Sequence, residues 1–126
     1  MIISKSDSEV DVYVNNGSNF TLDEVITVTF SLINLVLSGN GKLLFIDGNT
    51  GLFVYERVGL GTFTQIEQVS NNSAHLDIKT SEDGSHLASL PSVSLLKIYQ
   101  RINGVYSFVQ DIPGSAYVKL AISPDS

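Results

Sequence analysis

The sequence contains no cysteine and no tryptophan, and its 126 residues include only one methionine, two histidines and three prolines. Without cysteine, neither disulfide bonds nor thiolate chemistry contributes to the fold or the activity. Basic residues are also scarce, because seven lysines and arginines stand against thirteen acidic residues and the formal net charge is −6. Nucleic acids and anionic membranes attract positive surfaces, so neither is expected as a partner.

Long apolar runs are absent as well. No run approaches the roughly 18 residues that a membrane-spanning helix requires, and the apolar stretch at the start of the chain is too short for a secretory signal. We therefore expect a cytoplasmic protein. Apolar residues nevertheless make up 43% of the sequence, which is enough for a single globular domain over residues 1–126 with a core of its own.

What the sequence does contain is a threefold internal repeat of about 42 residues. Tyr13, Tyr55 and Tyr99 each follow a β-branched residue, in the segments VDVYV, LFVYE and LKIYQ. The chain is rich in Val, Ile, Thr, Tyr and Phe, and turn residues interrupt it about every 8 to 12 positions, which predicts strands and no helix. A repeat of this length filled with short strands is typical of the blades of a β-propeller.

Each repeat carries four apolar runs, and the first of them alternates apolar and polar residues with the period of a strand. This run occupies residues 33–38, 76–81 and 118–123. It ends in serine and is followed by GNGK, EDGS or PDS, and Asn-Gly and Asp-Gly tolerate the positive φ angles of a tight hairpin. The sequence therefore predicts that the first two strands of every blade form a β-hairpin.

Two further runs, LLFI and LFVY, are apolar at consecutive positions. Such a strand suits a sheet that is covered by neighbours on both faces, as propeller blades are. Three blades cannot close a ring, because propellers have roughly four to eight blades. We therefore expect an all-β fold, a β-propeller with three four-stranded blades per chain, whose ring is closed by homo-oligomerisation. Six blades would form as a homodimer, and nine as a homotrimer is the alternative.

One repeat also carries a local motif, in which Ser81, Asp83 and Gly84 precede Leu87, Ala88 and Ser89, and the chain ends on a similar Ser-Pro-Asp at residues 123–125. This pattern resembles the WD40-related propeller repeats, although the Trp-Asp pair that names the family is replaced by the repeated tyrosines. The resemblance implies a circular offset, with one blade split between residues 1–26 and 118–126.

The offset predicts an assembly seam in which residues 118–126 of one copy pair with residues 1–5 of the next, covering edge strands that would otherwise promote aggregation. The predicted seam consists of Met1, Ile2, Ile3, Ser4, Lys5, Val118, Lys119, Leu120, Ala121, Ile122 and Ser123.

Catalytic chemistry has little support in the sequence. His75 and His86 are the only histidines, and they show none of the HxH or HExxH spacings of a metal site. No GxSxG nucleophile motif is present either. We expect no enzyme, no metal and no cofactor, but a self-assembling scaffold or binding module that recognises a protein. A carbohydrate-binding lectin propeller and a fragment of a larger propeller are the alternatives.

Polar residues on the predicted innermost strands are the candidates for a channel or binding face. Asn34, Asp77 and Lys119 are equivalent in the repeat, Lys79 lies two positions after Asp77, and Tyr117 lies in the loop before a first strand. Loops at one end of the blades are expected to form a shared face for ligands. They comprise residues 27–32, 70–75 and 113–117, together with 6–8, 47–51 and 91–94.

Overall fold

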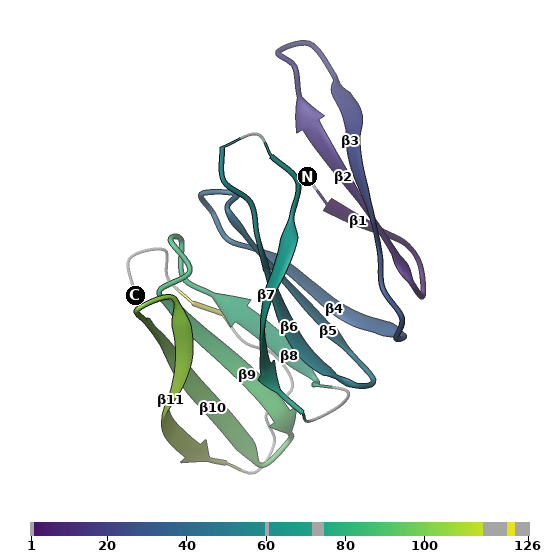
Figure 1. The fold of residues 1–126 in the computed structure, drawn as a ribbon. Helices are drawn as coiled ribbons and strands as arrows, with labels where there is room; N and C mark the ends of the chain where they lie inside the picture. Colours follow the sequence, from purple (N-terminus) through teal and green to yellow (C-terminus); the bar gives the residue numbers. More distant parts are fainter. Residues whose placement is uncertain (1, 60, 72–74, 115–120, 123–126) are drawn as a thin grey trace.

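The computed structural model describes residues 2–59, 61–71, 75–114 and 121–122. Within these residues the chain is all β and forms three antiparallel sheets of three, four and four strands, as the repeat predicted (Figure 1). The strands are β1 (Ile2–Ser6), β2 (Glu9–Asn15), β3 (Phe20–Thr27), β4 (Leu32–Leu37), β5 (Leu43–Gly48), β6 (Gly51–Glu56), β7 (Thr64–Ser70), β8 (Asp77–Thr80), β9 (His86–Ser92), β10 (Leu95–Ile102) and β11 (Val105–Pro113). The described part of the chain contains no helix with the length and apolar character of a membrane span.

The three sheets lie side by side in the order of the chain (Figure 1). Within each sheet, the strands that follow one another in the sequence pair with each other. We call them blade 1 (β1–β3), blade 2 (β4–β7) and blade 3 (β8–β11). The sequence predicted four strands in each blade, whereas blade 1 has three among the described residues. Its fourth strand was predicted at residues 118–126. Of these only residues 121 and 122 are described, and they lie outside any strand. The split of blade 1 between the two chain ends therefore stays a prediction.

The predicted hairpin turns of blades 2 and 3 are built from matching side-chain contacts. In blade 3, Ser81 Oγ donates to Asp83 Oδ1 at 3.2 Å, and the same oxygen accepts the Ser85 N–H at 2.9 Å. In blade 2, Asn40 takes the place of the aspartate and accepts from Ser38 Oγ at 2.7 Å. The hydrogen bond from the Ser85 backbone lowers the pKa of Asp83. These short polar side chains fix the turn locally, which is why the sequence predicted it.

Blade 2 is the central sheet, and its two middle strands, β5 and β6, are buried on both faces. Leu44 and Ile46 of β5 belong to the cluster shared with blade 1, whereas Leu43 and Phe45 belong to the cluster shared with blade 3. All four are at most 1% exposed. We call the contact between blades 1 and 2 the first seam and that between blades 2 and 3 the second seam. Consecutive apolar residues in LLFI thus pack alternately in the first and the second seam, because successive side chains of a strand point to opposite faces.

Tyr106 of β11 gives the second seam a testable pH dependence. Its ring packs edge-on against Phe45, with ring centroids 5.5 Å apart, and its hydroxyl donates to the Gly84 carbonyl. Burial raises the pKa of Tyr106 above the usual value of 10.0. The folded state therefore keeps this proton where the unfolded chain releases it, and stability falls as the pH rises above about 10.

We expect the free energy of unfolding to decrease above that pH by up to about 1.4 kcal/mol per pH unit from this residue. Urea denaturation between pH 8 and 11 measures the slope. The Tyr106→Phe variant, which has no ionisable hydroxyl, should show a shallower alkaline decline, and an identical decline in both proteins would contradict the assignment.

Candidate functional site

The loops between blades 1 and 2 are held together at one end of the sheets. The Val28 N–H donates to the Ser8 carbonyl at 2.9 Å, which joins the loop after β3 to the turn between β1 and β2. Ser31 and Asn49 connect that loop to the turn between β5 and β6, because the Ser31 N–H donates to Asn49 Oδ1 and the Asn49 N–H donates to the Ser31 carbonyl, each at 3.0 Å. Segments 6–8, 27–32 and 47–51 therefore form one continuous face.

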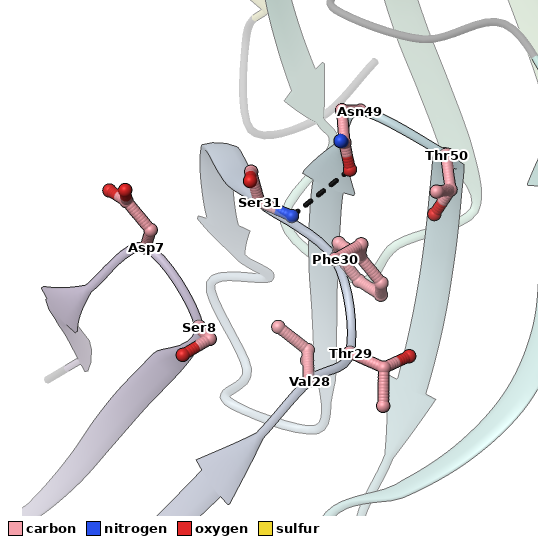
Figure 2. Close-up of a pocket in the computed structure, with 8 residues that line it drawn as sticks. All are labelled: Asp7, Ser8, Val28, Thr29, Phe30, Ser31, Asn49 and Thr50. Atoms are coloured by element: carbon pink, nitrogen blue, oxygen red, sulfur yellow. Dashed lines mark hydrogen bonds between the residues drawn. The ribbon is translucent and has the colours of Figure 1, made fainter.

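A hollow of about 350 Å³ opens on this face (Figure 2). Figure 2 shows the segment Val28–Ser31 between Asp7 and Ser8 on one side and Asn49 and Thr50 on the other. The lining residues are Asp7, Ser8, Val28, Thr29, Phe30, Ser31, Asn49 and Thr50. Phe30 is stacked on Phe53, with ring centroids 4.8 Å apart, so one face of its ring is already covered by the protein.

The hollow offers hydrogen bonds and one negative charge. Hydroxyl groups, an amide and the Asp7 carboxylate are the polar groups among its lining residues. None of these is a histidine or a cysteine, and across the described ranges no group of three or more His, Asp or Glu side chains is arranged to hold a metal ion. This chemistry suits the binding of a polar or hydroxyl-bearing ligand.

A second polar cluster lies inside the protein, between blades 2 and 3. Asp47 at the end of β5 contacts His75 Nδ1 through Oδ1 at 2.7 Å, and both side chains are fully buried. Asn34 of β4 donates from Nδ2 to Asp47 Oδ2 at 3.0 Å and to the His75 carbonyl at 2.8 Å. An ionised carboxylate only accepts hydrogen bonds, so this contact with an ionised Asp47 requires the proton on His75 Nδ1. The cluster ties the loop before β8 to two strands of blade 2.

The burial of this cluster matters for whether His75 could act as a general base. A general base must lie within hydrogen-bond reach of its substrate, and the His75 side chain has no exposed surface. His75 Nε2 has no hydrogen-bond partner among the described residues. Asp47 was not singled out from the sequence, although a carboxylate that ends the apolar run LLFI is an unusual feature that could have drawn attention to it.

The other candidate residues from the sequence are partly described. Asp77 and Lys79 lie on β8 with 3.6 Å between Oδ1 and Nζ, and the aspartate is buried whereas the lysine is 41% exposed. The strand register confirms that Asn34 and Asp77 occupy equivalent positions, since they pair with Asp47 and Leu90. Tyr117 and Lys119 lie outside the described residues, so a charged channel stays a prediction.

The same kind of polar contact occurs at each of the two internal seams. At the first seam, Glu24 of β3 accepts the Phe63 N–H through Oε1 at 3.0 Å. At the second seam, Glu67 of β7 accepts the Tyr106 N–H at 3.1 Å through either oxygen. In both cases the glutamate belongs to the last strand of one blade, and the aromatic residue lies at the start of the last strand of the next.

The aromatic position of this contact shows where a neighbouring blade is missing. Phe63 and Tyr106 are 7% and 6% exposed. Phe20, which begins the matching segment of blade 1, is 51% exposed, and Leu22 two residues later is 55% exposed. The same repeat position is therefore buried where a preceding blade covers it and open where none does.

Blade 3, at the other end of the row of sheets, shows the same contrast between covered and uncovered apolar residues. Leu52 and Val54 of β6 face blade 3 and are fully buried, as are Val10 and Val12 of β2 against blade 2. The equivalent positions on β10, residues 96 and 98, are only half-buried. In the described part of the chain, each end blade thus keeps one apolar face that has no partner sheet.

No protein-family model matches this sequence, and no curated protein is significantly similar to it. Solved structures do match. A putative 6-phosphogluconolactonase from Bacteroides fragilis superposes with a TM-score of 0.74 at 15% identity, over 93% of this chain and 36% of that one. The periplasmic gluconolactonase of Pseudomonas aeruginosa gives 0.66 at 15% identity, over 87% and 35% of the two chains. A functionally unknown protein from Desulfotomaculum acetoxidans gives 0.71 at 17% identity, over 90% and 38%.

These identities show the fold alone. Two of the three matches carry a lactonase name and are to 7-bladed β-propellers, and this chain spans little more than one third of the length of each of the three. The fold therefore belongs to the β-propeller class, and the described residues form an arc of three blades. The predicted propeller blades are confirmed, whereas the relation to WD40-related repeats stays a prediction.

Proposed function

We propose that this chain is a non-catalytic module that assembles with further copies of itself into a closed β-propeller and presents its loop face to a protein partner. The contrast between Phe20 and the buried Phe63 and Tyr106 carries the proposal. A face that is apolar, exposed and equivalent to two buried faces is the kind of surface that another blade covers. Burial of such a surface is favourable by about 25 cal/mol per Å².

The number of copies follows from the three blades per chain. Two copies would supply six blades and three copies nine, and six lies within the common range of propellers. The homodimer is therefore the preferred assembly, with the homotrimer second. No nucleic acid, membrane or cofactor enters this proposal, and a cytoplasmic location is part of it.

We expect the purified chain to have a native mass about twice 13.6 kDa, or three times that value for the trimer. Light scattering after size-exclusion chromatography measures this mass directly. Deleting residues 1–5 should abolish the discrete oligomer, because these residues include most of β1 and the predicted pairing partner of residues 118–126. A deletion variant with unchanged mass would contradict the predicted strand exchange, and circular dichroism would show whether the variant still contains folded sheets.

A second candidate is that the missing blades come from a longer chain. The match to little more than one third of 7-bladed propellers favours it. In that case the isolated chain would be a monomer at every concentration or would aggregate, and it would not form a discrete dimer or trimer. The native mass therefore distinguishes the two candidates.

For the ligand of the loop face, a glycan is the alternative to a protein. The hollow between blades 1 and 2 carries hydroxyl, amide and carboxylate groups around the partly covered Phe30 ring, which favours a glycan as the second candidate ligand. A glycan array with the purified chain would test it. Binding that is lost in the Asn49→Ala variant would support a lectin, and an array without signal would leave protein recognition as the proposed role.

A further inference from the structure

The seam contact occurs at a fixed position in the repeat, and the sequence contains a third copy of it. Glu24 pairs with Val12 across β2 and β3, and Glu67 pairs with Val54 across β6 and β7. Gln110 pairs with Ile98 across β10 and β11. Gln110 is therefore the equivalent of the two seam glutamates, but it lies on the end blade and its side chain is exposed.

The donor position has a third copy as well. Phe63 lies four residues before Glu67, and Tyr106 lies four residues before Gln110. Phe20 lies four residues before Glu24 and is the first residue of β3. The arc thus ends in an acceptor at Gln110 and begins with a donor position at Phe20, the two halves of the contact that closes each internal seam.

We infer that Gln110 of one copy accepts a hydrogen bond from the Phe20 N–H of a second copy, and that this contact sets the register of the seam between copies. The amide oxygen of glutamine is an acceptor at the same distance from the backbone as a glutamate oxygen. The apolar parts of the seam agree with this pairing. Leu96 and Ile98 of one copy would cover Tyr13 and Leu22 of the next, as Leu52 and Val54 pack within the same cluster as Tyr99.

The exchange of glutamate for glutamine also suits a contact between two acidic chains. Each copy carries a formal charge of −6, so two copies repel each other. A carboxylate at the seam would add to this repulsion, whereas a neutral amide keeps the acceptor without the charge. At an internal seam the same repulsion acts, but the chain itself holds the two blades together, so no association between separate molecules has to overcome it.

The resulting contact is head-to-tail, and its symmetry follows from that. A head-to-tail interface closes into a ring when its rotation divides the full turn. In a dimer the two-fold axis would coincide with the propeller axis, and two identical Gln110 to Phe20 contacts would form. This inference rests on the proposed self-assembly and names the residues that perform it.

The test compares Gln110→Ala with Gln110→Glu and with a control, Thr64→Ala, which truncates an exposed side chain on the central blade. Sedimentation velocity over a concentration series gives the dissociation constant of the oligomer. A neutral hydrogen bond corresponds to about fivefold in affinity, so loss of two in a dimer should raise the dissociation constant about 25-fold in Gln110→Ala. The control should leave it unchanged, and Gln110→Glu should associate more tightly than Gln110→Ala at 0.5 M salt, where repulsion is screened.

Hydrogen exchange measured by NMR adds a readout at the donor itself. The Phe20 amide should exchange slowly in the wild-type oligomer and faster in Gln110→Ala, while the Phe63 and Tyr106 amides stay protected in both. An oligomer whose dissociation constant and Phe20 exchange are the same in Gln110→Ala as in the wild type would overturn this inference and leave self-assembly standing. A wild-type chain that is monomeric at every concentration would overturn self-assembly, and the inference with it.

Discussion

Replacing Phe45 by alanine is expected to lower the free energy of unfolding by about 3–5 kcal/mol. Phe45 has no exposed surface and is the largest fully buried side chain among the described residues. It stands on the central blade, and its ring packs edge-on against Tyr106 of blade 3. The substitution would therefore open a cavity in the second seam and remove an aromatic contact at the same time.

Such a loss is large for a domain of this size, because native proteins are stable by only about 5–15 kcal/mol. Urea denaturation at a fixed protein concentration measures it, since self-association would make the apparent stability depend on concentration. Phe108→Ala is the aromatic control, because this ring is 54% exposed and contacts Tyr99 edge-on, so its removal should cost only about 1–2 kcal/mol. Equal losses in the two variants would show that the second seam is not a packed core.

Replacing Asp47 by alanine is the second change with a large expected effect, a loss of about 2–6 kcal/mol, since each of two buried donors left without a partner costs about 1–3 kcal/mol. Asp47 is the shared acceptor of His75 Nδ1 and Asn34 Nδ2 in a cluster without solvent contact at either the aspartate or the histidine. Its removal would leave two donors buried without their partner. A buried donor that loses its hydrogen bond costs more than the bond itself contributes, because it has also lost water.

Two comparisons isolate this effect. Asp47→Asn keeps one acceptor oxygen at nearly constant volume, so we expect an intermediate loss of about 1–3 kcal/mol. Asp111→Ala removes the exposed carboxylate that lies 3.0 Å from Lys97 Nζ, and a surface ion pair contributes at most about 1 kcal/mol. Denaturation midpoints that fall equally for Asp47→Ala and Asp111→Ala would contradict the structural role of the buried cluster.

The cluster also shows the limit of what the sequence predicts. His75 and Asp47 are 28 residues apart, and Asn34 is 41 residues from His75. Neither separation follows a local rule, because the contact exists only once the loop before β8 is placed against blade 2. The hairpin of Ser81, by contrast, depends on side chains within five residues of each other, and the sequence predicted it.

The contacts at the seams were likewise only partly predictable from the sequence. Equivalent segments can be recognised in the sequence at residues 20, 63 and 106, where FTLDEVI, FTQIEQV and YSFVQDI begin. Their similarity does not predict that the glutamate four residues after Phe20 or Phe63 reaches into the next blade. Glu24 contacts a residue 39 positions away, as does Glu67. Such a contact requires the distance and angle between two sheets, and these depend on the packing of side chains from both.

The sequence by itself therefore determined the all-β class, the three repeats, the hairpins and the two-faced central blade. Strand period and turn chemistry are local properties of the backbone, and a repeated pattern states them three times. Only the tertiary structure decided which residues join the blades, that Asp47 and His75 are buried together, and that Phe20 and Gln110 are left at opposite ends of the arc. These features arise where separate sheets meet, so no segment of the chain contains them alone.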